Sequence, residues 1–337
     1  MLFNSYNFLF LFLPVTIFFF FITRKISDIK SVIYILIISS FVFYSVHNSQ
    51  YLILFIFSII TNYIIGEKII QNKNSLNKNY AKIILNIGIT INLVLLFIFK
   101  YADFFISNIS KLGFDIPKLN LLLPIGISFY TFQQIGYIVD CYKNKETSCK
   151  FSEYALFVSF FPQLIAGPIV HHSQFINQIK SNFYKPFTYE NFSVGLIIFI
   201  LGLFKKIIIA DTISAKLVSP FYSSISQGEI QTIFGAWLGT VSYTLQIYYD
   251  FSAYSEMAIG LGLLFGIKLP INFNSPYKSN SLIEYWSRWN ITLTNFIRDY
   301  IYQPFFARMS NITNNFFSNH IVSIIFSMSI SGFWHGA

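Results

Sequence analysis

Long apolar stretches recur along almost the whole chain and are separated by short polar segments. A helix needs about 20 mostly apolar residues to cross the hydrocarbon core of a bilayer. The pattern predicts membrane-embedded helices over 8–23, 31–46, 51–66, 81–99, 121–139, 153–170, 191–209, 231–249, 251–267 and 319–335. We therefore expect an all-α polytopic membrane protein with about ten membrane-embedded helices, including broken or re-entrant segments.

The composition excludes a soluble globular domain. Only 11% of the residues are charged, against about 25% in an ordinary soluble domain, and the mean hydropathy is +0.57. The net charge of +9 does not indicate nucleic acid, because the basic residues lie between apolar runs, where they orient membrane helices. Cys141 and Cys149 share one polar loop and form no zinc or disulfide pattern. We expect no metal site and no bound cofactor.

The basic residues also predict how the chain is oriented. The N-terminal segment has no lysine or arginine, whereas loop 24–30 carries Arg24, Lys25 and Lys30, and loop 67–82 carries four lysines. Basic loops favour the cytoplasmic side, so we expect an extracytoplasmic N-terminus. Because no basic region precedes the first apolar run, that run is expected to be a membrane helix, not a cleaved signal peptide.

Two of the predicted helices contain helix-breaking residues. "LLLPIGISFY" contains Pro124 and Gly126, and "FPQLIAGPIV" contains Pro162, Gly167 and Pro168. Within a membrane, such breaks are tolerated where protein or a water-filled cavity satisfies the freed backbone groups. The breaks favour helices that line a cavity, with simple kinks as the alternative.

Asp250 and Glu256 lie within or beside an apolar segment, where an ionised carboxylate is costly. Six residues apart on a helix, they do not share a face. A catalytic pair of carboxylates is therefore disfavoured, and we expect them to pair with lysine or arginine or to lie at the interface. Gly262 and Gly266 have the spacing that permits close helix packing.

The stretch "SNSLIEYWSRWNITLTNFIRDYIYQPF" carries too many charges for a simple span. Ser281 and Glu284 form a potential capping box that starts a helix at Leu282, and Glu284 and Arg288 have the favourable i,i+4 spacing. We expect an interfacial or re-entrant helix pair that ends at Pro304. A surface amphipathic helix without a catalytic role is the alternative.

Three histidines are candidates for acid–base chemistry. His171 and His172 are adjacent, so on a helix they would point apart, and they resemble loop residues after Pro168. His335 follows a complete apolar run in "SGFWHGA". Burial there would favour the neutral ring, which is the form that a general base needs. A structural core histidine is the alternative.

Several ordered motifs together resemble a known family. They are "FLFLFLPV", "LPIGISFYTFQ", "FVSFFPQLIAGPI", "GLFKKIIIADT", "YYDFSAYSEMAIGLGLLFGIKLPINFNSPY", "YWSRWNITLTNFIRDYIY" and "SGFWHGA". In this order the chain closely resembles the membrane-bound O-acyltransferase (MBOAT) family. The similarity is to its bacterial polysaccharide-acetylating branch, which includes alginate O-acetylases and the membrane subunits of peptidoglycan O-acetyltransferases.

The resemblance implies an integral-membrane O-acyltransferase of the bacterial cytoplasmic membrane. It would transfer acetyl groups from acetyl-CoA or another cytosolic thioester to hydroxyls of a cell-surface polysaccharide, with a periplasmic partner protein. The resemblance also implies that His335 is the catalytic histidine and that Asn290 occupies the second signature position, which is usually histidine in this branch. We further expect the tunnel that holds the substrates to include Trp289, Arg288, Trp334 and Asp250.

The motifs span residues 1–337 as one MBOAT domain. Family members continue with further helices beyond the Trp-His-Gly motif, so a C-terminally truncated chain is expected. Two alternatives remain open at this stage. One is a polytopic transporter or flippase for a lipid-linked glycan, which broken helices and intramembrane carboxylates would also suit. The other is an inactive truncated family member.

Overall fold

The computed structural model describes residues 1–74, 77–114, 116–143, 148–182 and 188–336. Throughout these residues the regular structure is helical, without strands, so the predicted all-α class is confirmed. The chain divides into two compact units. Unit 1 contains Met1–Phe43, Phe160–Pro168 and Gln178–Asn274, and unit 2 contains Tyr44–Ser159, Ile169–Asn177 and Ser275–Ala337.

Six helical segments in the described part of the chain are long and apolar enough to cross a membrane. Each overlaps one of the predicted spans, and together they make this a multi-pass membrane protein. The segments are Asn7–Ile26, Ile29–Val46, Ser49–Lys73, Lys78–Lys100, Tyr189–Ser226 and Phe316–His335.

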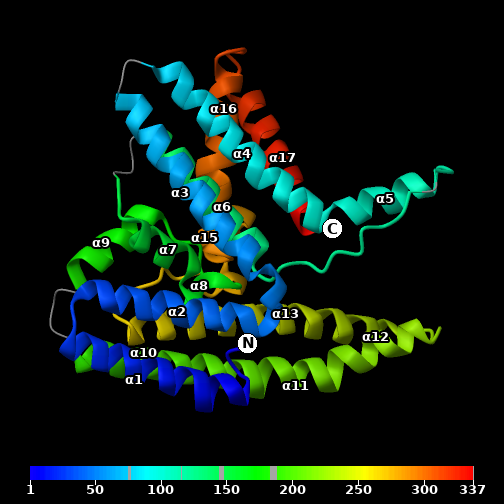
Figure 1. Cartoon of the computed structure of the whole chain (residues 1–337). Helices are drawn as coiled ribbons and strands as arrows, with labels where there is room; N and C mark the ends of the chain where they lie inside the picture. Colours follow the sequence, from blue (N-terminus) through cyan, green and yellow to red (C-terminus); the bar gives the residue numbers. More distant parts are fainter. Residues whose placement is uncertain (75–76, 115, 144–147, 183–187, 337) are drawn as a thin grey trace. The chain divides into compact units, whose positions relative to one another are not determined.

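Unit 1 is built on a long helical rod that packs along a second long helix, α13 (Ile233–Leu264). Figure 1 shows the two side by side. A Cβ atom at Gly260 of α13 would lie 2.6 Å from the carbonyl oxygen of Gly195, so the two backbones can approach this closely only without side chains. The rod consists of α10 (Tyr189–Phe204), η3 (Lys205–Ala210), α11 (Asp211–Ile213), η4 (Ser214–Val218) and α12 (Ser219–Ser226).

The continuous α13 corrects two sequence-based predictions. Segments 231–249 and 251–267 were expected as separate helices, but a single helix runs through Asp250. The predicted packing role of Gly262 and Gly266 is also wrong. Gly266 has φ +78° and ends the helix, and the Ile267 amide donates to the Gly262 carbonyl at 2.8 Å. The close helix contact is instead made by Gly260.

The remaining helices of unit 1 surround an aromatic core. The Phe161 ring is central, because it packs edge-on against Phe12 at 5.2 Å and against Phe265 at 5.6 Å. Such edge-to-face pairs are favoured by the ring quadrupoles. These helices are η1 (Asn7–Phe12), α1 (Leu13–Ile26), the first part of α2 (Ile29–Asn48) and α8 (Phe161–Leu164).

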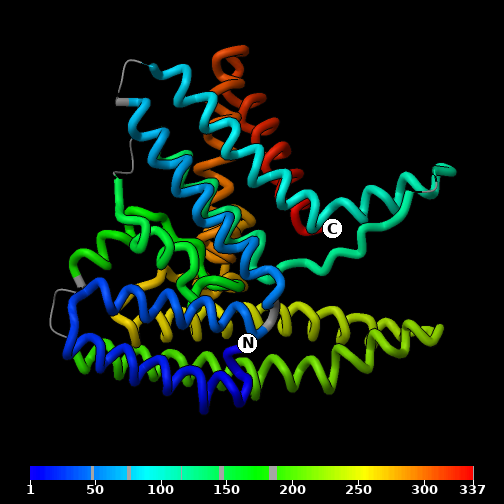
Figure 2. Tube along the Cα trace, in the orientation of Figure 1, coloured from blue at the N-terminus to red at the C-terminus, as the bar shows by residue number. Residues whose placement is uncertain are grey.

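In unit 2, three helices pack together around buried amides. They are α3 (Leu52–Asn74), α4 (Lys78–Lys100) and α6 (Ile127–Tyr142), and their traces run beside one another in Figure 2. Ser58 and Asn62 both donate to Gln134 Oε1, at 2.7 and 2.9 Å, and Asn92 donates to Asn62 Oδ1 at 2.7 Å. These polar contacts join all three helices where lipid tails offer no hydrogen bonds.

Ten further helical elements lie in the described part of unit 2, and among them α17 packs against α16 and η6. They are η2 (Ser49–Tyr51), α5 (Ala102–Ser110), α7 (Phe151–Ser159), the start of α9 (His172–Asn182), η5 (Pro276–Lys278), α14 (Leu282–Arg288), α15 (Ile291–Ile297), η6 (Arg298–Tyr302), α16 (Gln303–Ser310) and α17 (Phe316–His335).

The predicted helix breaks are confirmed. Helix α6 begins only at Ile127, after Gly126 at φ +72°, so predicted span 121–139 is helical over its second part alone. Segment 153–170 is also broken, but it divides at Phe160, and Pro162 lies in the first turn of α8. That helix ends at Leu164, before Gly167 and Pro168. The cavity described below is lined by α6, as the break at Gly126 suggested.

In the charged stretch 279–305, the predicted start of a helix is confirmed, whereas the predicted end at Pro304 is wrong. Helix α14 begins at Leu282, and the Ser281 hydroxyl accepts from the Glu284 amide at 3.1 Å. Pro304 does not end the helical stretch but lies in the first turn of α16. The preceding turn, η6, is π-helical, which is a local adjustment that accommodates a proline within a helix.

Candidate active site

The predicted catalytic histidine lies on the last turn of α17, beside the end of α4. The Trp334 carbonyl accepts hydrogen bonds from the Lys100 ammonium and, at 3.3 Å, from the Tyr101 hydroxyl. The Tyr101 ring also stacks on Phe333 at 4.7 Å, with 7° between the planes. A lysine commonly satisfies the last carbonyls of a helix in this way. These contacts fix the backbone next to His335.

His335 itself is exposed at the end of α17. Its ring packs edge-on against Trp334, with 4.2 Å between the centroids. No hydrogen bond joins the His335 side chain to any described residue. The neighbouring Trp334 indole N–H is buried and likewise has no hydrogen-bond partner among the residues described. The arrangement thus presents a donor and a titratable ring side by side.

A large apolar cavity adjoins Trp334. Its volume is about 470 Å³, and its lining comes from α4, α6, α15, η6 and α17, all within unit 2. Phe97, Phe132, Phe296 and Trp334 contribute aromatic walls. Pockets of this size, mostly apolar with a few polar groups, are typical of small-molecule sites in proteins.

Asn290 lies at the sharp turn between α14 and α15. Its backbone is left-handed, with φ 41° and ψ 54°, and its side chain makes no capping hydrogen bond. Among residues other than glycine, asparagine, aspartate and histidine tolerate this conformation best. The described contacts include none between Asn290 and His335. Asparagine therefore suits the left-handed backbone of this turn. The catalytic role of Asn290 remains a prediction.

Arg288 and Trp289 are positioned by their own helix. Arg288 pairs with Glu284 at 2.7 Å, as the i,i+4 spacing predicted. Trp289 stacks on Tyr285 at 5.7 Å. Hydrogen bonds from the Asn280 backbone N–H and the Arg288 guanidinium lower the pKa of Glu284. Its carboxylate therefore supports the start of α14 at neutral pH, and this support is lost as the pH falls through the lowered pKa.

Asp250 belongs to unit 1 and is ion-paired there. Lys206 Nζ lies 2.7 Å from an Asp250 oxygen and 2.8 Å from an Asp211 oxygen. Glu256 pairs in the same way with Lys205. The expectation that these carboxylates pair with basic residues is confirmed. The role of Asp250 in a substrate tunnel remains a prediction.

We predict that removing the lysine of this ion-pair network destabilises the protein more than removing one of its carboxylates. Lys206→Met should lower the free energy of unfolding by about 1 kcal/mol or more, because it leaves two carboxylates without their shared cation. Asp250→Asn should cost less, because Lys206 keeps Asp211. Thermal unfolding of the purified protein in one detergent checks this order, and a larger loss for Asp250→Asn would contradict it.

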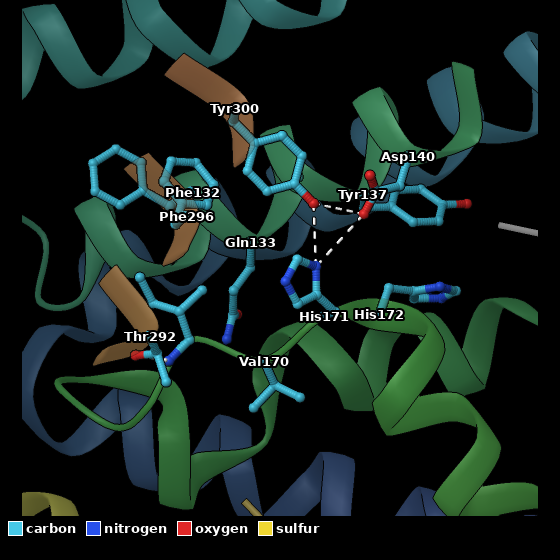
Figure 3. A pocket seen from close by; sticks show the side chains of 12 residues that line it. Phe132, Gln133, Tyr137, Asp140, Val170, His171, His172, Thr292, Phe296 and Tyr300 are labelled. Atoms are coloured by element: carbon cyan, nitrogen blue, oxygen red, sulfur yellow. Dashed lines mark hydrogen bonds and ion pairs between the residues drawn. The ribbon is translucent and has the colours of Figure 1, made fainter. Parts of the chain in front are cut away.

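A second polar cluster was missed by the sequence analysis. Figure 3 shows the side chains of Asp140, His171 and Tyr300 meeting at a small pocket in unit 2. The Tyr300 hydroxyl lies 2.6 Å from Asp140 Oδ2 and 3.2 Å from His171 Nδ1. The three residues come from α6, the segment before α9, and η6. No spacing in the sequence could bring them together, and His171 had been interpreted as a loop residue.

Comparisons with known proteins agree with the resemblance found in the motifs. The family model described as "MBOAT, membrane-bound O-acyltransferase family" matches residues 10–337. The peptidoglycan O-acetyltransferase of Helicobacter pylori is 41% identical over 370 residues, covering 100% of this chain and 67% of the relative. The probable alginate O-acetylase AlgI of Pseudomonas aeruginosa is 35% identical over 344 residues, covering 100% of this chain and 62% of the relative.

A more distant similarity extends to another cell-envelope enzyme. The teichoic acid D-alanyltransferase of Bacillus subtilis is 27% identical over 224 residues, covering 65% of this chain and 55% of the relative. The chain thus spans about two thirds or less of the length of these curated relatives.

Proposed function

Because the chain belongs to the membrane-bound O-acyltransferase family, we propose that it transfers acetyl groups to hydroxyls of a cell-surface polysaccharide. The observation that carries the proposal is the family match over residues 10–337, with relatives named as a peptidoglycan O-acetyltransferase and a probable alginate O-acetylase. The site geometry supports it, because His335 adjoins Trp334, which lines an apolar cavity of about 470 Å³.

The donor in this proposal is acetyl-CoA or another cytosolic thioester. The protein would lie in the bacterial cytoplasmic membrane with its N-terminus outside, and a periplasmic partner would complete transfer to the polymer. We also propose that residues 1–337 act as one MBOAT domain.

In the proposed reaction, His335 acts as the general base. Its neutral ring takes the proton of the acceptor hydroxyl, and that oxygen attacks the thioester carbonyl carbon. The carbon–sulfur bond then breaks, and the departing thiolate takes the proton back from the imidazolium. The Asn290 amide would donate to the carbonyl oxygen while it carries negative charge. Trp289, Arg288, Trp334 and Asp250 would contact the substrates.

The rival transporter interpretation loses one of its two supports. Unpaired carboxylates within the membrane would have suited an ion-coupled carrier, but Asp250 and Glu256 are held by Lys206 and Lys205.

Deleting the gene in its own host tests the proposed function. We expect base-labile acetate on the surface polysaccharide to fall to the background of the assay and to return when the gene is restored. The measurement is acetate released by mild alkali from purified polymer, normalised to its sugar content. If the deletion strain keeps its acetate while the polymer is exported normally, the proposal is wrong. If the polymer itself is lost from the surface, the transporter interpretation is favoured instead.

A further inference from the structure

The cluster of Asp140, His171 and Tyr300 has a defined hydrogen-bond direction. Asp140 is 3% exposed, and its Oδ2 atom accepts a hydrogen bond from the Tyr300 hydroxyl at 2.6 Å. The Tyr300 oxygen then accepts from His171 Nδ1 at 3.2 Å. This assignment places the imidazole proton on Nδ1 and leaves Nε2 as an acceptor. A carboxylate and a phenol thus hold the ring in one tautomer.

Two acceptors in the cluster have no donor within the described residues. Asp140 Oδ1 is buried without a hydrogen-bond partner, and His171 Nε2 forms no hydrogen bond there either. A buried carboxylate oxygen without a donor is costly. The cluster therefore calls for a ligand that donates a hydrogen bond, and a group that can only accept one, such as a thioester carbonyl, would not satisfy it.

The size of the adjoining pocket limits which hydrogen-bond donor can enter it. The pocket measures about 20 Å³, and roughly 10–15 Å³ by this measure is enough for one water. A terminal hydroxyl has the size of a water molecule. An amide N–H is flanked by heavy atoms on both sides and is too large. Lys143 already places a positive charge 5.6 Å from the Tyr300 ring centroid, which disfavours a second cation.

The small pocket and the large apolar cavity have three lining residues in common. Phe132, Phe296 and Tyr300 line both. A ligand with a hydroxyl in the small pocket would have its remaining atoms directed to these aromatic walls, beside a cavity of about 470 Å³. Burying an alkyl body there is favourable by about 0.8 kcal/mol per methylene.

We propose that unit 2 contains a binding site for an amphiphilic alcohol. Its terminal hydroxyl donates to Asp140 or His171 in the small pocket, and its alkyl body occupies the large cavity. This inference goes beyond acyl transfer and does not depend on it, because binding can be measured without turnover. Tyr300 is the central residue, since its hydroxyl joins the cluster and its ring lines both the small pocket and the large cavity.

Photolabelling in lipid nanodiscs tests the site. Three probes share one medium-length alkyl chain with a photoreactive diazirine, and they differ only in ending as an alcohol, an alkane or an amine. Mass spectrometry then measures labelling of the peptides that contain Phe132, Phe296 and Trp334. We expect the alcohol to label these peptides at least about tenfold more than the alkane, because one hydrogen bond to a charged or buried acceptor favours it.

Variants of the cluster should remove this preference. Asp140→Asn and His171→Leu should each bring the alcohol-to-alkane ratio close to one. Tyr302→Phe, which removes the hydroxyl of a Tyr–His pair outside the cluster, should leave the ratio unchanged. The alkane signal reports whether the cavity is intact, so a variant that misfolds is recognised by its loss. If Asp140→Asn misfolds, the His171 variant still tests the site, because its side chain is 35% exposed.

Three results would overturn the proposal. Equal labelling by alcohol and alkane in the unaltered protein would show that no hydroxyl is recognised. Stronger labelling by the amine would show that the site selects a cation. A ratio that stays high in both cluster variants would place the recognition elsewhere.

Discussion

Replacing His335 by alanine is expected to lower base-labile acetate on the surface polysaccharide at least about a hundredfold. The reason is the proposed mechanism, in which no other group takes the proton of the acceptor hydroxyl. The measurement is acetate released from polymer of cells that produce each variant at the same level. His320→Ala is the matched control, because it lies on the same helix α17 and pairs with Tyr302 at 2.6 Å.

The control separates chemistry from folding. His320→Ala should keep most of the acetate, because its ring lies fifteen positions before His335 on α17 and contacts Tyr302 and Phe306. An equal loss in both variants would mean that α17 is merely sensitive to substitution. Full acetylation in the His335 variant would remove the general-base role altogether.

Asn290→Leu is expected to abolish the activity, for two physical reasons. Leucine has no amide to donate, and loss of one oxyanion donor costs about a hundredfold or more in rate. Leucine also disfavours the left-handed backbone at φ 41°, at a cost of about 1–2 kcal/mol. The assay is the same acetate release, accompanied by thermal unfolding of the purified variant.

Two further substitutions distinguish these reasons. Asn290→Gly permits the left-handed turn but has no side chain, so we expect near-normal stability with about a hundredfold lower activity. Asn290→His tolerates the turn and can still donate, so it should keep partial activity. If the glycine variant is fully active, Asn290 acts only through its backbone. If the leucine variant is fully active, the residue has no role in the reaction.

The left-handed turn also gives a physical reason for the difference at this position. The resembled branch usually carries histidine where this chain has Asn290. Both residues are enriched in left-handed backbone and both can donate a hydrogen bond. The substitution is therefore conservative in backbone conformation, even though asparagine cannot exchange a proton.

Local features were predictable from the sequence because they depend on neighbouring residues. The start of α14 follows from the Ser281 cap, and the start of α6 follows from Gly126. The six membrane-length helices follow from apolar runs. The ion pairs of Asp250 and Glu256 follow from the cost of an isolated carboxylate in an apolar setting.

The errors arose where distant contacts decide the outcome. Asp250 was expected to separate two helices, but Lys206 neutralises it and α13 continues. Gly266 matched a packing motif, yet it ends a helix. Pro304 was expected to end a helix, but the wide turn before it accommodates the ring.

The functional site likewise contains residues that the sequence predicted and residues that it did not. His335, Asn290 and Trp334 were found through motifs. Lys100, which donates to the Trp334 carbonyl, was not identified from the sequence, because the contact joins helices 234 positions apart in the chain. The cluster around Tyr300 joins segments separated by 160 and 129 positions. Such long-range contacts leave no periodic signal in one sequence.

Transfer of labelled acetate in membrane vesicles from the host tests the central claim most directly. Inverted vesicles keep the protein in its own membrane, and they expose the cytoplasmic face to an added thioester that carries a radiolabelled acetyl group. The account predicts ester-bound label on the polysaccharide with the unaltered protein and with His320→Ala, and only background label with His335→Ala. Equal labelling with His335→Ala, or with vesicles that lack the protein, would contradict it.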